Sequence, residues 1–111
     1  MPLHSGHPLR VAEPAGDIQF RKQMAITRKE FLRNLAVALS GRPYYRIEHN
    51  EIIVPDAGRR IAITLCEQQE QRIGSLQLPR MLVEFTFSGY SDSEAETLMT
   101  HINIHFQRGG G

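Results

Sequence analysis

The sequence contains a single cysteine, Cys66, so no disulfide can form within the chain. Its apolar runs are short, and none approaches the roughly 18–20 residues that a membrane helix requires. The first residues, M-P-L-H-S-G-H-P, lack the apolar segment of a secretory signal. These absences lead us to expect a soluble, cytoplasmic protein with no membrane partner.

Motifs for nucleotide binding and for common catalytic sites are also missing. Neither G-x-x-x-x-G-K-S/T nor G-x-G-x-x-G occurs, and H-E-x-x-H and G-x-S-x-G are absent as well. The net charge of +1 is too small for a nucleic-acid-binding surface, and the basic residues are not interleaved with aromatic ones. The sequence therefore predicts no nucleic-acid partner and no cofactor, and it favours a protein without enzymatic activity.

What the chain does contain is typical of one folded domain. It has 111 residues, of which 41% are hydrophobic and 23% charged, as in ordinary globular proteins. Residues 1–23 hold three of the six prolines without sustained apolar periodicity, which predicts a flexible tail. Within this segment Ile18 and Phe20 alternate with polar residues, so a short strand there is an alternative. The folded domain is predicted over residues 24–108, followed by a flexible glycine tail at 109–111.

Two segments have helical spacing, and each begins with a capping box, in which a Ser or Thr is followed three residues later by Glu. Thr27 and Glu30 mark the first start, and Ser91 and Glu94 mark the second. The expected apolar stripes are Phe31, Leu32, Leu35, Ala36 and Leu39 in the first helix, and Ala95, Leu98, Met99, Ile102 and Phe106 in the second.

Alternation of apolar and polar residues predicts strands at 44–48, 51–54, 59–67, 72–78 and 81–88. The polar run 67–71 predicts a hairpin loop, and Pro79 predicts an interruption of pairing before the last strand. Connections this short require antiparallel pairing. The expected fold class is therefore α+β in two layers: an antiparallel sheet of four to five strands, with the N-terminal and C-terminal helices packed on one face.

The opposite face of this sheet would carry small and mildly polar side chains, from Ala62, Thr64, Cys66, Glu84 and Thr86. Such a face resembles neither a core nor a strongly solvated surface, so it is a candidate dimer or ligand surface. The leading hypothesis is a non-enzymatic protein-interaction module, or a homodimer that associates through this face or through an edge strand.

A second hypothesis is a small-molecule-binding or enzymatic domain, with a pocket between the helices and the sheet. Tyr44, Tyr90, His101 or Cys66 would line this pocket. Cys66 falls on a predicted strand and not at a helix N-terminus, where a thiolate would be stabilised. The sequence alone leaves the choice between the two hypotheses open.

His101 and His105 are spaced i, i+4, which brings two imidazoles to one side of a helix and suits a metal ion. A zinc site needs at least a third ligand, and the helix offers none at useful spacing. The alternative is that both histidines flank the apolar stripe near the helix C-terminus, where the helix dipole favours them.

The chain ends in Arg108, Gly109, Gly110 and Gly111. This end resembles the glycine tails of ubiquitin-like and sulfur-carrier proteins, whose tails enter the narrow channel of an activating enzyme. The resemblance implies a carrier that uses Gly109, Gly110 and Gly111. In those families the tail leaves a strand, whereas here it follows a predicted helix.

Overall fold

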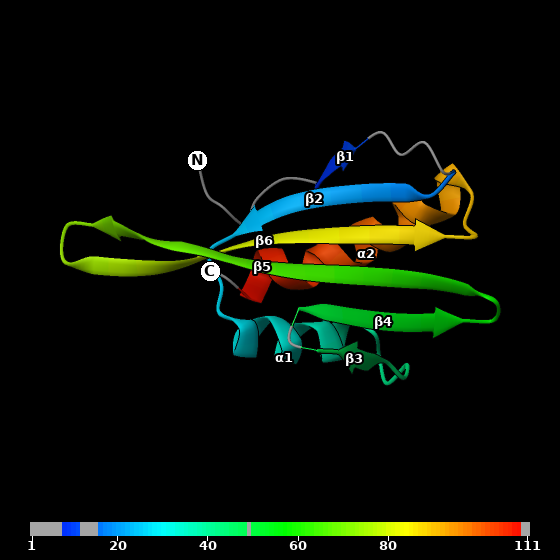
Figure 1. The fold of residues 1–111 in the computed structure, drawn as a ribbon, viewed down its shortest axis with the longest axis horizontal. Helices are drawn as coiled ribbons and strands as arrows, with labels where there is room; N and C mark the ends of the chain where they lie inside the picture. Colours follow the sequence, from blue (N-terminus) through cyan, green and yellow to red (C-terminus); the bar gives the residue numbers. More distant parts are fainter. Residues whose placement is uncertain (1–7, 12–15, 49, 110–111) are drawn as a thin grey trace.

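The computed structural model describes residues 8–11, 16–48 and 50–109 of the chain. It has the predicted α+β class, with an antiparallel sheet and two helices (Figure 1). The described sheet has six strands, one more than the upper prediction. In chain order the elements are β1 (Leu9–Val11), β2 (Ile18–Met24), α1 (Arg28–Ala38), β3 (Tyr45–Ile47), β4 (Glu51–Asp56), β5 (Arg59–Ile73), β6 (Leu76–Ser88) and α2 (Asp92–Gly109).

The segment before the first helix belongs to the sheet. The strand order is β1-β2-β6-β5-β4-β3, so β2 lies between β1 and β6. Ile18, Phe20 and Met24 of β2 are buried in the core. Residues 9–11 and 18–23 of the predicted tail therefore lie in strands, and the alternative of a short strand at Ile18 and Phe20 is present as β2. Residues 1–7 and 12–15 lie outside the described part. The tail prediction failed because the partner that buries this short alternation, β6, is distant in the sequence.

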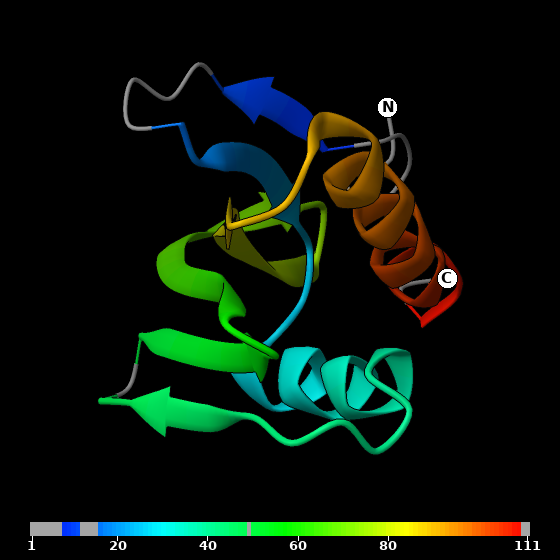
Figure 2. The ribbon, with the colours of Figure 1, turned by 90° about the vertical axis from the view of Figure 1, so that its right-hand side faces the viewer.

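Both helices begin where the capping boxes predict. At α1, the Glu30 N–H donates to Thr27 Oγ1 at 3.2 Å, and the Thr27 N–H donates to Glu30 Oε1 at 3.0 Å. At α2, Ser91 and Glu94 form the same reciprocal pair, at 3.2 and 2.9 Å. Each box satisfies N–H groups that a helix start otherwise leaves unpaired. Both helices lie on the same side of the sheet, as Figure 2 shows.

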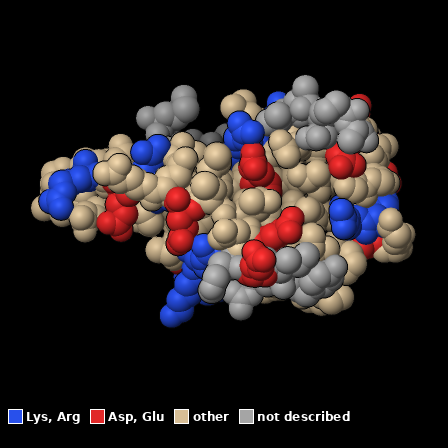
Figure 3. All heavy atoms as spheres, viewed as in Figure 1, with Lys and Arg blue, Asp and Glu red and all other residues tan. Residues whose placement is uncertain are grey.

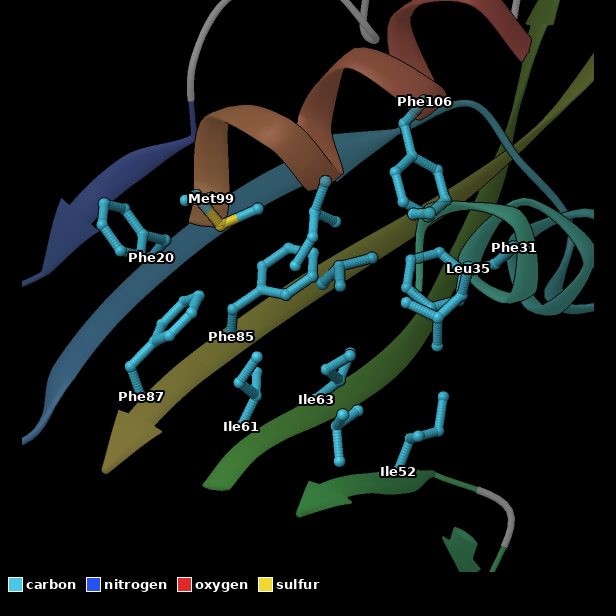
Figure 4. Close-up of a cluster of buried hydrophobic side chains, with 14 of the residues drawn as sticks. Phe20, Phe31, Leu35, Ile52, Ile61, Ile63, Phe85, Phe87, Met99 and Phe106 are labelled. Carbon is cyan, nitrogen blue, oxygen red and sulfur yellow. The ribbon is translucent and has the colours of Figure 1, made fainter. Parts of the chain in front are cut away.

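One core joins the helices to the inner face of the sheet (Figure 4). Phe31 of α1 stacks on Phe106 of α2, with ring centroids 4.8 Å apart. In α1, Ala36 is exposed and Ala38 is buried, because the buried face follows the spacing of Phe31 and Leu35. The inward strand positions alternate as predicted and include Ile52, Val54, Ile61, Ile63, Leu65, Val83, Phe85 and Phe87.

A polar pair is buried between β2 and α2. The Lys22 Nζ donates a hydrogen bond to Asn103 Oδ1 at 2.6 Å, and both residues are buried. Burial disfavours the charged form of the amine and lowers the pKa of Lys22 from 10.5 to about 8.

The long β5–β6 hairpin differs from its prediction. The polar run 67–71 belongs to β5, and the turn lies further on, at Gly74 and Ser75. β6 continues through Pro79, because a register shift between Gln68 and Gln71 places a bulge opposite this proline. A proline has no N–H to donate to a ladder, and a bulge tolerates that loss. The expected loop and interruption are therefore wrong, and the hairpin is continuous.

Candidate functional site

A groove runs between the two helices, which are in contact at one end and separate toward the other. The N-terminal part of α1 meets the C-terminal part of α2 at the Phe31–Phe106 stack. Away from this stack, a narrow hollow of about 110 Å³ lies between the helices, with Ile61 of β5 beside it. Its aliphatic lining comes from Ala38, Leu39, Ile61, Leu98 and Ile102.

The groove widens beyond Leu98 into a second hollow of about 360 Å³. Arg42 and Leu98 line both hollows, so the two hollows adjoin at these side chains. Ser40 and Gly41 have positive φ, at 52° and 84°, and turn the chain after α1 toward Arg42. The rest of the wide lining is mostly polar, from Asp56, Arg59, Ser93, Glu94 and Thr97. The groove therefore has a narrow end in which aliphatic walls are joined by Ser40, Arg42 and His101, and a wide end that contains charges of both signs.

Arg59 is fixed at the wide end by four neighbours. Its Nη2 donates to Asp56 Oδ2 and its Nη1 donates to Glu94 Oε2, both at 3.0 Å. The guanidinium lies over the ring of Tyr90, 4.4 Å from the centroid. A Cβ added at Gly89 would meet Arg59 Cγ at 3.0 Å, so glycine leaves room for this arginine. Arg59 is thus a rigid wall of the groove.

The two carboxylates at the wide end already have partners. The Tyr90 hydroxyl donates to Asp56 Oδ2 at 2.9 Å, and burial together with this bond raises the pKa of Tyr90 to about 12. Hydrogen bonds from Ser91, with the nearby charge of Arg59, hold the pKa of Glu94 below its ordinary value. Glu94 is therefore ionised near neutral pH, and both acids line the wide end together with the two arginines.

Arg42 is the less committed arginine. In the described part of the chain its guanidinium makes one ion pair, with Asp56 Oδ2 at 3.8 Å, and no hydrogen bond. That separation exceeds hydrogen-bonding distance. Its side chain is 40% exposed. A guanidinium has five N–H donors in a planar fork, so Arg42 has donors to offer to a bound molecule.

The second candidate site is the outer part of the β5–β6 hairpin, residues 67–80, which we call the arm. β4 pairs with β5 only as far as Thr64, and β2 pairs with β6 only from Met81 onward. The arm therefore projects from one end of the molecule, which is 47 Å long and 26 Å wide (Figure 1). Near its turn, Ile73 is 53% exposed and Leu76 is 62% exposed.

Charged groups follow one another along the arm. Glu67, Glu70 and Arg72 are all exposed on β5. Figure 3 shows basic side chains at the tip of the arm and acidic ones nearer the body of the molecule. At the base, Arg28 of α1 forms an ion pair with Glu67 at 3.0 Å. The arm is thus attached at its base, and within the described part of the chain no strand pairs with either of its edges.

The outer sheet face carries Glu84, Thr86 and Cys66, as predicted, but these residues do not converge on a hollow. Glu84 pairs with Arg21 at 2.8 Å, and the Gln19 amide donates to Thr86 Oγ1 at 3.2 Å. Cys66 is exposed on the same face. The polar side chains of this face contact one another, which leaves few of them available to a partner.

The other predicted site residues are distributed between the core and the groove. Tyr44 packs partly buried against the core, and Tyr90 is buried beneath Arg59. His101 lines the narrow hollow, with the ring of His105 5.4 Å from its own. No group of three or more potential metal ligands occurs among the described residues. The predicted metal pair therefore has no third ligand there.

At the C-terminus, α2 continues through Gly109, the first residue of the predicted glycine tail. Gly110 and Gly111 lie outside the described residues. No helix in the described part of the chain is long and apolar enough to cross a membrane.

The groove residues that sequence reasoning missed are Arg42, Asp56, Arg59 and Thr97. Asp56 and Arg59 are directly opposite each other across the Ala57–Gly58 turn. A two-residue hairpin turn predicts that pairing, so the sequence held a signal for this ion pair.

Comparisons of the chain with protein-family models, with curated proteins and with solved structures found no match.

Proposed function

We propose that this protein is a self-associating module, in which two copies pair through their arms. The observation that carries the proposal is the arm itself, a two-stranded ribbon that exposes Ile73 and Leu76 and that neither described helix covers. Isolated two-stranded hairpins are marginally stable in water, and further strands stabilise them. Pairing of two arms would form a four-stranded ribbon.

The β5 edge of the arm is better suited to this pairing than the β6 edge. Residues 67–73 contain no proline, so each retains an N–H. The β6 side contains Pro79, which has no N–H to offer. An unpaired strand edge is a template for a second strand, and antiparallel pairing of two identical strands has the two-fold symmetry that most dimers use.

The charges on β5 favour one register. With Gln71 opposite Gln71 of the second copy, each Glu70 lies opposite Arg72 of the second copy. Opposite charges placed directly across two strands are stabilising, and like charges are destabilising, by roughly 0.2–1 kcal/mol for each pair. The register therefore supplies two favourable charge pairs to each dimer.

Sedimentation velocity over a range of micromolar concentrations tests the proposal. We expect the wild type to form a dimer. The dissociation constant of Glu70→Arg should be at least about fivefold higher, because each introduced arginine would lie opposite Arg72 of the second copy. The double variant Glu70→Arg/Arg72→Glu restores opposite charges and should recover the wild-type constant. A wild type that stays monomeric at hundreds of micromolar would remove the proposal. Equal dissociation constants for the single and double variants would contradict the proposed register.

A further inference from the structure

The narrow end of the groove is suited to an apolar group. Its walls are the aliphatic side chains of α1, β5 and α2 already described, and its volume of about 110 Å³ admits a short side chain. Ligand sites commonly combine such an apolar lining with a few polar groups that fix orientation. Here Ser40, Arg42 and His101 also line the narrow hollow, whereas Asp56, Arg59 and Glu94 line only the wide end.

The wide end contains charges of both signs. Arg42 and Arg59 stand opposite Asp56 and Glu94, so the lining has no net charge. Arg59 is bound to both carboxylates, which leaves Arg42 to bind an incoming anionic group. The carboxylates retain further lone pairs, since a carboxylate has about four acceptor positions. The Ser93 and Thr97 hydroxyls add uncharged donors and acceptors to the rim.

We propose that the groove binds a small zwitterion with an aliphatic side chain, of the chemical class of a free α-amino acid such as leucine. The ligand carboxylate binds the Arg42 guanidinium, for which two parallel N–H bonds are the favoured geometry. The ligand ammonium lies toward Asp56 and Glu94. The side chain enters the narrow hollow past Leu98.

A ligand with one charge fits less well. A plain carboxylate at Arg42 would lie close to Asp56, which is only 21% exposed, with no cation of its own to offset the repulsion. A plain amine would leave the donors of Arg42 unused. The two analogues that lack one charge each are therefore the informative controls.

Isothermal titration calorimetry with leucine, isocaproate and isoamylamine separates these cases. We expect leucine to bind at least about tenfold more tightly than either analogue, since each analogue loses a charge-assisted hydrogen bond. Isocaproate that binds as tightly as leucine would overturn the zwitterion assignment. Absence of binding by leucine at millimolar concentration would overturn the site.

Arg42→Gln is the matching variant of the protein, and it should weaken leucine binding at least about tenfold. Arg33→Gln removes the same charge from an exposed position on α1 that does not line the groove, and it should leave the affinity unchanged. Equal affinity in both variants would contradict the role of Arg42. The groove and the arm are separate, so failure of this test leaves the self-association proposal untouched.

Discussion

The β5–β6 hairpin consists of two parts that have the same backbone pairing but different surroundings. In the body, residues 60–66 pair with 82–88 beneath both helices, and the inward side chains are fully buried. In the arm, the same two strands continue past a bulge, and the side chains of residues 67–77 are exposed. Ladder hydrogen bonds are thus present in both parts, whereas only the body has a layer packed against it.

The difference shows which interactions stabilise this fold. A backbone hydrogen bond exchanges for a bond to water on unfolding, so its net contribution is only about 1 kcal/mol. Burial of an aliphatic side chain contributes roughly 1.5–3 kcal/mol. The body should therefore determine the stability of the molecule, and the arm should be free to change without affecting it.

The sharpest test uses the same residue type in both parts of β5. Ile63 is fully buried, and Ile73 is 53% exposed. We expect Ile63→Ala to lower the free energy of unfolding by roughly 2–5 kcal/mol, because it leaves a cavity. Ile73→Ala should change it by no more than about 0.5 kcal/mol. Urea denaturation at a concentration where the protein is monomeric measures both changes. Similar losses of unfolding free energy in the two variants would contradict the difference between body and arm.

Ionisable groups buried in the body should make its stability depend on alkaline pH. Between pH 8 and 10.5 the folded Lys22 has lost a proton that the unfolded chain still holds, so the free energy of unfolding should rise with pH there. The gain is at most roughly 3 kcal/mol, from the difference between the two pKa values. In Lys22→Met, the free energy of unfolding should not change with pH over this window. If it rises with pH as much as in the wild type, the effect does not come from Lys22.

Tyr90 should act in the opposite direction at higher pH. Its pKa is raised from 10 to about 12, so its stabilising contribution is complete below pH 10 and is lost as the pH rises toward 12. Tyr90→Phe removes the hydrogen bond to Asp56 and should cost about 1–2 kcal/mol at neutral pH. When tyrosine ionisation is followed by ultraviolet absorbance, the transition at the highest pH should be absent from this variant. If that transition remains, it belongs to another tyrosine.

The smallest effect is expected on the outer sheet face. Arg21 and Glu84 form a partly exposed ion pair. Such pairs contribute about 0–1 kcal/mol, and added salt screens them. Glu84→Gln should therefore lower stability by less than about 1 kcal/mol in low salt, and by less in high salt. A loss comparable to that of Ile63→Ala would mean that this face stabilises the fold as the core does.

Local signals in the sequence predicted much of the fold. The two capping boxes, and the alternation of β6 and of the first part of β5, depend on neighbours within a few residues, and the structure confirms them. The arm was misread because Glu67 to Gln71 has no apolar face, which is the usual sign of a strand. Its strand structure comes from pairing with β6, and no local property of the run shows this.

The groove could not be assembled from the sequence for a similar reason. Arg42, the Asp56–Arg59 hairpin and Glu94 come from three separate stretches, and the positions of the helices bring them together. Only the Asp56–Arg59 pair is local. The separation of the helices beyond the Phe31–Phe106 stack depends on packing across the whole core.

The pairing of β2 with β6 also governs when the chain can fold as it is made. Gln19 and its partner Thr86 are 67 residues apart, and β6 joins β2 to the rest of the sheet. β2 is synthesised early but has its main partner only after β6 has left the ribosome. Until then Phe20 and Phe31 lack Phe87 and Phe106, the rings that they contact in the finished core. The nascent chain must therefore expose this apolar surface until most of the protein has been translated.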